Sequence, residues 1–264
     1  MPYRVLALKD KIVLITGASS GIGRAAAKQF AEIGAKLILV ARRDDRLQIL
    51  KKELEEEHKV EAHTVAIDLQ DLDRVQALVP GLPDNFKEVD VLVNNAGLAL
   101  GKAPAHQNDI GDVATMLDTN CKSLVVLTQQ VAEGMVKRNW GHIINVSSIA
   151  AHDHYAGGSV YCGTKAFVAA FTNATRHDLV GTNVRVTAIS PGAVQTEFSN
   201  VRFKGDDQAA DSVYAGIVPL TAADIADQIV YAATRPSHVQ IGEIVSYATY
   251  QASPTNIARV LLQK

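Results

Sequence analysis

Short apolar runs alternate with longer stretches of helical periodicity along most of the chain. Runs rich in Val, Ile and Leu predict buried strands, and they cover residues 11–16, 36–41, 60–67, 89–94, 142–147, 184–190 and 243–249. Apolar positions three and four residues apart predict helices between them, over residues 21–33, 44–58, 71–79, 108–138, 159–180 and 221–234. This alternation predicts an α/β fold with a doubly wound (Rossmann) parallel sheet of about seven strands.

One long segment interrupts the alternation. Residues 192–220 follow the sixth predicted strand and contain no strand pattern of their own. Their polarity and their place beyond a strand end predict a mobile substrate lid. An ordinary surface insertion of helix and loop fits the same composition. The chain shows no internal repeat, low-complexity tract or linker, so we expect a single domain over residues 1–264.

Composition narrows the class of protein. The chain has 264 residues, 47% of them apolar, which is enough for a large core. A net charge of −2 and a pI near 6.4 argue against nucleic acid or an anionic membrane as partner. No apolar run approaches the roughly 20 residues of a membrane span, and the N-terminal stretch MPYRVLALKD is too weakly apolar for a secretory signal. Cys121 and Cys162 form no CxxC motif, which favours reduced thiols and a cytoplasmic location.

A glycine-rich turn links the first predicted strand to the first predicted helix. The sequence there is TGASSGIG at 16–23, with glycine spacing GxxxGxG. Gly17 permits a tight turn, Gly21 lets the backbone approach a pyrophosphate, and Gly23 allows the helix to pack on the strand. The helix N-terminus then offers free N–H groups to the phosphates. We therefore predict a dinucleotide site.

The end of the second predicted strand favours NADP(H) over NAD(H). An NAD-selective site usually has an acidic residue there, which holds the ribose 2′-hydroxyl. Here Arg42 and Arg43 follow Ala41, and the first acid is Asp44. Guanidinium groups can bind a 2′-phosphate bidentately. The alternative is that both arginines are solvated charges at the start of the next helix, where the helix dipole disfavours cations.

Tyr161 and Lys165 are four residues apart, with Ser148 thirteen residues before the tyrosine. One helical turn separates the pair, so phenol and ammonium share a helix face. Lowering a phenol pKa from ~10 to about 7 requires roughly 4 kcal/mol. A cation about 4 Å away supplies that much at an effective dielectric of about 20. The spacing therefore suggests a tyrosine acid/base.

These motifs, together with NNAG at 94–97, Asn120 and the Pro191-Gly192 step, resemble the short-chain dehydrogenase/reductase family. The resemblance implies that Tyr161 exchanges the substrate proton, Lys165 lowers its pKa and binds the nicotinamide ribose, Ser148 donates to the carbonyl oxygen, and Asn120 supports a water relay. It also implies a cofactor site formed by Gly17, Ser19, Ser20, Gly21, Ile22, Gly23, Arg42, Arg43, Asp68, Leu69, Asn95, Ala96, Gly97, Tyr161, Lys165, Pro191, Gly192, Val194 and Thr196.

The segments NNAGLALGKAPAH, HYAGGSVYCGTKAF and TEFSNVRFKGDD are similar to the branch of NADP-dependent 3-hydroxy acid dehydrogenases that act on serine and allo-threonine. The resemblance implies interconversion of short 3-hydroxy and 3-oxo acids. A carboxylate needs a nearby cation, and Arg202 or Lys204 in the lid could supply it, with Ser148 and Tyr161 contacting the reacting oxygen. Both lid cations could also be solvated. The alternatives are a broad carbonyl reductase of uncharged ketones and aldehydes and a non-catalytic NADPH-binding protein.

Other groups predict little chemistry. His152 and His154 form an HxH pattern without an evident third ligand, so we expect no metal site. Apart from GASSG within the glycine-rich turn itself, no GxSxG motif surrounds a serine, which argues against a hydrolase. Phe167, Ala170 and Phe171 suggest a second apolar face on the helix at 159–180, and the resemblance implies a homotetramer. These three residues could instead belong to the core.

Overall fold

The computed structural model describes residues 5–260, so the first four residues of the N-terminal stretch considered as a signal lie outside it. Within this range, seven strands form one parallel sheet in the order β3-β2-β1-β4-β5-β6-β7. Their bounds are β1 Ile12–Thr16, β2 Lys36–Ala41, β3 Ala62–Ala66, β4 Val91–Asn94, β5 Gly141–Val146, β6 Val184–Pro191 and β7 Glu243–Ser246. The predicted doubly wound sheet is confirmed. The predicted strand ends differ by at most three residues, since the last strand ends at 246 and not at 249.

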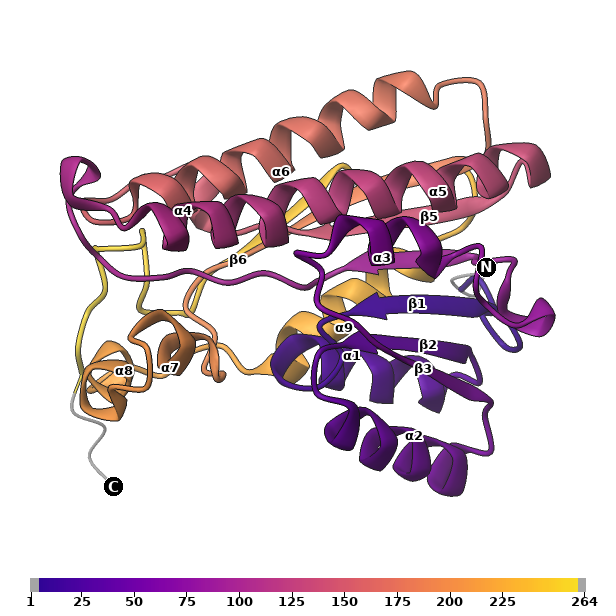
Figure 1. Ribbon diagram of the computed structural model, residues 1–264, viewed down its shortest axis with the longest axis horizontal. Helices are drawn as coiled ribbons and strands as arrows, with labels where there is room; N and C mark the ends of the chain where they lie inside the picture. The colour runs from indigo at the N-terminus through magenta and orange to yellow at the C-terminus, as the bar shows by residue number, and fades with distance from the viewer. Residues whose placement is uncertain (1–4, 261–264) are drawn as a thin grey trace.

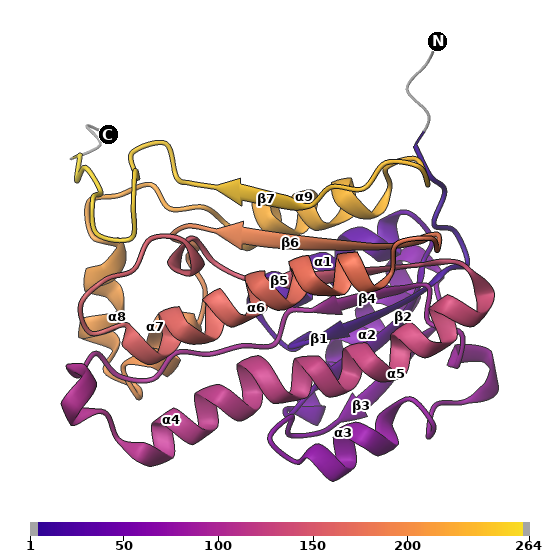
Figure 2. The same cartoon turned by 90° about the horizontal axis from the view of Figure 1, so that it is seen from above.

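Helices cover both faces of the sheet (Figure 1). One face carries α1 Gly21–Glu32, α2 Asp44–His58 and α9 Ala222–Ala233. The other carries α3 Leu72–Leu78, α5 Ser123–Arg138 and α6 Ser159–Asp178, and α4 Ile110–Leu117 leads into α5 (Figure 2). Short 3-10 turns lie at η1 Asp84–Phe86, η2 Ala105–Gln107 and η4 Ile149–Ala151. Parallel strands covered on both faces explain why their sequences are nearly continuous apolar runs.

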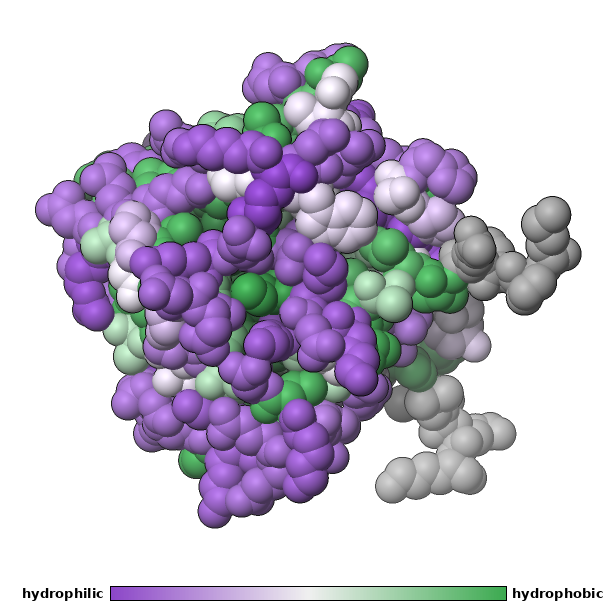
Figure 3. Space-filling view, turned by 90° about the vertical axis from the view of Figure 1, so that its right-hand side faces the viewer, coloured by the Kyte–Doolittle hydropathy of each residue, from purple (hydrophilic) through white to green (hydrophobic). Residues whose placement is uncertain are grey.

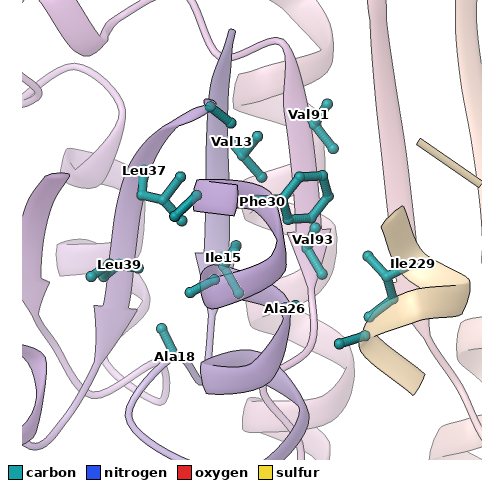
Figure 4. Close-up of a cluster of buried hydrophobic side chains, with 14 of the residues drawn as sticks. Val13, Ile15, Ala18, Ala26, Phe30, Leu37, Leu39, Val91, Val93 and Ile229 are labelled. Atoms are coloured by element: carbon teal, nitrogen blue, oxygen red, sulfur yellow. The ribbon is translucent and has the colours of Figure 1, made fainter. Parts of the chain in front are cut away.

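The core under α1 is built around Phe30. Its ring points from α1 toward Val13 of β1 and Val91 and Val93 of β4, and Ile229 of α9 lies close to the same cluster (Figure 4). Full burial of one such side chain stabilises the fold by about 1.5–3 kcal/mol. A second buried cluster on the opposite face packs α3 and α5 against the sheet. The sheet is therefore a rigid platform for the loops at its ends.

The strand order reverses at β1, which pairs with β2 on one side and with β4 on the other. Loops that leave the carboxyl ends of these strands diverge, and the resulting crevice is the usual ligand site of such sheets. The segment 192–220 lies at this end and forms two short helices, α7 Phe198–Arg202 and α8 Asp207–Tyr214 (Figure 1). The predicted lid segment thus stands beside the crevice.

The amino ends of the strands lie at the opposite end of the sheet from the crevice. Hydrophilic residues cover most of the face at the amino ends of the strands (Figure 3). Over residues 5–260, no helix combines the length and apolar character needed to cross a membrane.

The helix predicted over 108–138 is confirmed from Ile110 to Arg138, with one local change that the sequence did not predict. The chain forms α4, then a π-helical turn η3 at Asp118–Lys122, and then α5. The Asn120 side chain in this turn donates to the Leu98 carbonyl oxygen at 2.8 Å and accepts from the Leu98 N–H at 2.9 Å. π turns of this kind are common at functional sites. The apolar periodicity of residues 108–138 predicts a helix but does not show which of its turns is π-helical.

Candidate active site

A cleft of about 540 Å³ opens at the carboxyl ends of the strands. Twenty of the sequence-predicted site residues line it: Gly17, Ser19, Ser20, Gly21, Ile22, Arg42, Arg43, Asp68, Leu69, Asn95, Ala96, Gly97, Ser148, Tyr161, Lys165, Pro191, Gly192, Val194, Thr196 and Arg202. The other two, Gly23 and Asn120, are buried directly behind the lining. The structure therefore brings together residues that lie far apart in the sequence.

The glycine turn has the backbone geometry that the sequence predicts. Gly17 and Gly21 have φ values of +69° and +50°, a region that favours glycine. A Cβ on Gly23 would overlap the Gly17 carbonyl oxygen, so this position also requires glycine. The Asn95 amide donates to the Thr16 carbonyl oxygen at 2.8 Å, which ties the turn to the end of β4. The turn is thus held open in front of α1, whose N-terminus faces the cleft.

Arg43 lies against this turn. Its guanidinium donates to the Ser19 hydroxyl from Nε at 3.2 Å and from Nη2 at 3.1 Å, and to the Ser20 hydroxyl from Nη2 at 2.9 Å. Its Nη1 is 2.9 Å from Oε2 of Glu197, a residue just before α7. Arg42 is more exposed, with Nη1 3.8 Å from Asp68. Both arginines therefore line the cleft beside the turn, as a 2′-phosphate site requires.

Lys165 and Asn120 meet at the floor of the cleft. A Cβ on Gly97 would lie 3.3 Å from Lys165 Nζ and 3.4 Å from Asn120 Oδ1. The absence of a side chain at Gly97 therefore lets the backbone pass close to both polar groups. Asn120 also donates to the Thr164 hydroxyl at 3.0 Å. The π turn and the start of α6 are thus joined around the ammonium. Asn120 is therefore a buried amide whose two N–H groups are engaged and whose Oδ1 accepts from Leu98 N–H.

Ser148 and Tyr161 line the same part of the cleft as Lys165. Ser148 lies two residues after the end of β5 and caps η4, where its hydroxyl accepts from the Ala150 N–H at 3.1 Å. A hydrogen bond from Ser148 lowers the pKa of Tyr161, but burial raises it more, so the net shift is upward from the ordinary value of 10.0. The neighbouring Ser147 hydroxyl instead donates to the Lys165 carbonyl oxygen. Ser148 is thus the serine that faces the cleft.

The expected effect of Lys165 on Tyr161 is not observed in this arrangement. Lys165 Nζ lies 5.9 Å from the centre of the Tyr161 ring and donates to the Val146 carbonyl oxygen at 2.8 Å. Burial lowers the pKa of Lys165 to about 8. A buried ammonium at this distance does not offset the burial of the phenol. In this arrangement burial outweighs Lys165 in setting the Tyr161 pKa, and the lowering of that pKa by Lys165 stays a prediction.

Arg202 is the cation of the lid segment that enters the cleft. It is 9% exposed, and its Cζ lies 6.0 Å from the centre of the Tyr161 ring. Its Nη1 donates to the Tyr155 hydroxyl at 2.8 Å and its Nε donates to the Gly101 carbonyl oxygen at 3.3 Å. Within residues 5–260, Nη2 is buried without a hydrogen-bond partner and no carboxylate pairs with Arg202. A buried cation of this kind is costly unless a ligand compensates it.

Lys204, the other predicted lid cation, lies elsewhere. Its Nζ is 2.8 Å from Asp112 Oδ2, and its side chain is 59% exposed. A different lysine, Lys102, lines the cleft near Arg202, and burial together with the Arg202 charge lowers its pKa. The positive charge around the substrate space therefore comes from Arg202 and Lys102.

Sequence reasoning missed several residues of the cleft. The most informative are Lys102, Tyr155 and Glu197, which contact or approach predicted site residues. Each of them is a charged or phenolic residue close in sequence to a recognised motif: Lys102 follows NNAG, Tyr155 precedes the YxxxK pair, and Glu197 lies in TEF. That proximity is the signal that could have identified them. In the HxH pattern, His152 hydrogen-bonds a carboxylate, with Nε2 2.6 Å from Glu243 Oε1. Within the part of the chain that the structure describes, no group of three His, Cys, Asp or Glu side chains could hold a metal ion.

Comparison with known proteins identifies the family. A family described as short chain dehydrogenase matches residues 11–207. The chain belongs to this family. It is 48% identical over 234 residues to an NADP-dependent 3-hydroxy acid dehydrogenase of Salmonella typhi, which covers 88% of this chain and 93% of the relative. It is 46% identical over 242 residues to sulfoacetaldehyde reductase 2 of Chromohalobacter salexigens, covering 91% and 95%.

A solved structure agrees with these relatives. The closed form of serine dehydrogenase complexed with NADP⁺ aligns with a TM-score of 0.87 and 45% identity, over 91% of this chain and 96% of that one. This member of the family is therefore an NADP-dependent oxidoreductase. The cleft fits the cofactor, because glycine is required at the turn and a guanidinium with two hydroxyls stands beside it.

Proposed function

We propose that the enzyme interconverts short 3-hydroxy acids, of the serine, allo-threonine and 3-hydroxybutyrate type, with their 3-oxo acids. The observation that carries the proposal is Arg202, a buried guanidinium beside Tyr161 with one nitrogen left unpaired among the described residues. A substrate carboxylate would compensate this charge and place the neighbouring carbons next to the phenol. The relatives named as 3-hydroxy acid dehydrogenases support the same substrate class.

The residues would divide the chemistry as follows. When bound, NADP(H) would supply or accept the hydride. In reduction, Tyr161 gives its proton to the carbonyl oxygen as the hydride reaches the carbon, and Ser148 donates a hydrogen bond to that oxygen. In oxidation, Tyr161 receives the hydroxyl proton. A phenol whose pKa burial raises is protonated at neutral pH, which is the form that reduction needs.

Lys165 and Asn120 would return the proton to Tyr161. The Lys165 ammonium, with a pKa lowered to about 8, gives up a proton more readily than a solvated lysine. Asn120 lies beside it with Gly97, where a water bound to the amide could pass a proton on. Lys165 would also hydrogen-bond the nicotinamide ribose.

The remaining cofactor contacts are also proposals. Arg42 and Arg43 would bind the 2′-phosphate, Asp68 and Leu69 the adenine, and Asn95, Ala96 and Gly97 the ribose side. Residues 191–196 would flank the nicotinamide. All of these line the same cleft, which supports the arrangement.

A substrate panel tests the proposal. Initial rates with NADP⁺ are measured for serine, allo-threonine and 3-hydroxybutyrate, and for matched alcohols that lack the carboxylate. We expect kcat/KM to be at least about tenfold higher for the acids, equivalent to about 1.4 kcal/mol. Equal values for acids and neutral alcohols would refute the substrate class and favour a broad carbonyl reductase.

We also propose a homotetramer in the cytoplasm. Phe167 of α6 is 41% exposed and stacks on Phe171 with ring centres 5.9 Å apart, so these residues lie at the surface and not in the core. An exposed apolar helix face supports association. The free, buried cysteines Cys121 and Cys162 support a reducing compartment. A monomeric mass in light scattering at micromolar protein would refute the tetramer.

A further inference from the structure

Glu197 stands where the cofactor phosphate is expected. It follows Thr196 at the start of the lid segment and lines the cleft together with Ser19, Ser20 and Arg43. Its Oε2 is 2.9 Å from Arg43 Nη1, and its Oε1 is 2.6 Å from Nη1 of Arg46 in α2. The carboxylate therefore bridges two arginines of the nucleotide half of the cleft.

These contacts engage four of the five N–H donors of Arg43. The serine hydroxyls of the turn take Nε and Nη2, and Glu197 takes Nη1. A guanidinium has five N–H donors in one plane, and a phosphate uses a pair of them bidentately. A 2′-phosphate that binds at this turn would thus contact Arg43 while Glu197 already occupies its Nη1.

The charges of the cluster make this meeting unfavourable. The hydrogen bond from Arg46, with further contributions from Arg43, holds the pKa of Glu197 below its ordinary value, so the group is anionic at neutral pH. A nucleotide phosphate monoester carries about −1.5 to −2 charges at pH 7. Two anions bound to one guanidinium repel each other. If Glu197 leaves Arg43, it can keep its ion pair with Arg46.

We propose that Glu197 is a specificity-determining residue that competes with the 2′-phosphate of NADP(H) for Arg43. NADP(H) binding would displace the carboxylate from Arg43 onto Arg46 alone and loosen the start of the lid segment from the nucleotide half. NAD(H), which lacks the phosphate, would leave the bridge intact. The inference rests on the proposed placement of the 2′-phosphate at Arg43 and is independent of the proposed substrate.

The test uses two nucleotides that differ only in the phosphate concerned. Calorimetric Kd values for adenosine 2′,5′-bisphosphate and adenosine 5′-monophosphate are measured on the full chain and on Glu197→Gln. We expect the variant to bind the bisphosphate about three- to tenfold more tightly and the monophosphate unchanged. The gain should shrink when salt rises from about 50 to 500 mM. Unchanged or weaker bisphosphate binding would overturn the proposal.

Two further variants make the result specific. Glu133→Gln removes the same charge from an exposed pair with Lys137 far along the chain, and it should leave both Kd values unchanged. Arg43→Ala should weaken the bisphosphate by at least about tenfold, as loss of a charge-assisted contact predicts. If Arg43→Ala has no such effect, the phosphate binds elsewhere and the competition is excluded. If Arg43→Ala weakens binding but Glu197→Gln does not strengthen it, the placement holds and the competition is wrong.

Discussion

Arg202 lies over the ring of Tyr161, with its Cζ 6.0 Å from the ring centre. The same guanidinium donates to the Tyr155 hydroxyl, so two phenols and one cation share the substrate end of the cleft. Burial raises the pKa of both phenols, and the Arg202 charge lowers it only in part. Arg202 therefore joins the lid segment to the chemical centre, and an anion bound to it would also reach Tyr161.

Tyr161→Phe should abolish turnover and leave NADPH affinity nearly intact. The substitution removes the proton donor but keeps the ring that packs against Phe198 at a centre distance of 5.5 Å. General acid catalysis contributes about 10²–10⁴-fold, so kcat should fall at least a hundredfold. Stopped-flow kcat and fluorescence titration of NADPH measure the two quantities. Retention of more than about a tenth of kcat would show that another group exchanges the proton.

Replacing both Arg42 and Arg43 by Ala should weaken NADPH binding much more than NADH binding. Only NADPH carries the 2′-phosphate, and a charge-assisted contact is worth roughly 1.5–3 kcal/mol. The preference for NADPH, measured as a ratio of Kd values, should fall by at least about tenfold. The single variants show how much each arginine contributes to this preference, because Arg43 contacts the turn whereas Arg42 approaches Asp68. An equal loss for both cofactors would make the arginines structural.

Local patterns predicted the nucleotide turn, whose geometry depends on spacing within one strand, turn and helix. Glycine at 17, for example, is required by a positive φ that the strand-turn-helix context already implied. Tyr161 and Lys165 share α6 as their four-residue spacing predicts, and Ser148, from the segment after β5, lines the same cleft. The catalytic roles of these three residues stay predictions. The fold class was equally accessible, because buried parallel strands give continuous apolar runs.

Contacts between distant segments were not accessible in this way. The partners of Arg202 lie 101 and 47 residues away at Gly101 and Tyr155, and Glu197 reaches Arg43 across 154 residues. The sequence named Arg202 and Lys204 as lid cations and favoured Arg202, and packing is what separates them, since Arg202 lines the cleft and Lys204 pairs with Asp112. The upward shift of the Tyr161 pKa has a related origin, since burial depends on the whole fold and not on the four-residue spacing to Lys165.

Lys165 should make folding stability depend on pH. Burial lowers its pKa from the ordinary 10.5 to about 8, so between these values the unfolded chain binds more protons than the folded one. Stability from this group therefore rises with pH over that window, by up to about 1.4 kcal/mol per unit and roughly 3 kcal/mol in total. The free energy of unfolding of Lys165→Met, minus that of the natural chain, should fall between pH 8 and 9.5.

Urea unfolding at pH 7, 8, 9 and 9.5 measures this difference. The exposed Lys137→Met is the control, because its ammonium stays in water in both states. A difference for Lys165→Met that is flat across the range would show that the buried ammonium costs the fold little.

Arg202→Ala should separate acidic from neutral substrates. If Arg202 holds the carboxylate in a closed site, its loss costs roughly 2 kcal/mol or more, about a thirtyfold rise in KM for serine or 3-hydroxybutyrate. KM for an uncharged ketone should change little, because that substrate makes no charge-assisted contact. Lys204→Ala is the matched control, since Lys204 pairs with Asp112 outside the cleft and should alter neither KM.

Two further variants decide how Arg202 acts. Tyr155→Phe removes the hydroxyl that accepts from Nη1 at 2.8 Å but leaves the charge, so it should raise KM for the acids by less than Arg202→Ala does. Arg202→Lys keeps the charge but loses the planar fork, and it should recover only part of the loss if the carboxylate is bound bidentately. If Arg202→Ala raises KM equally for acids and ketones, Arg202 supports the cleft without reading a carboxylate. The enzyme would then be a carbonyl reductase of uncharged substrates, and the cation beside Tyr161 would serve mainly to stabilise charge on the phenol.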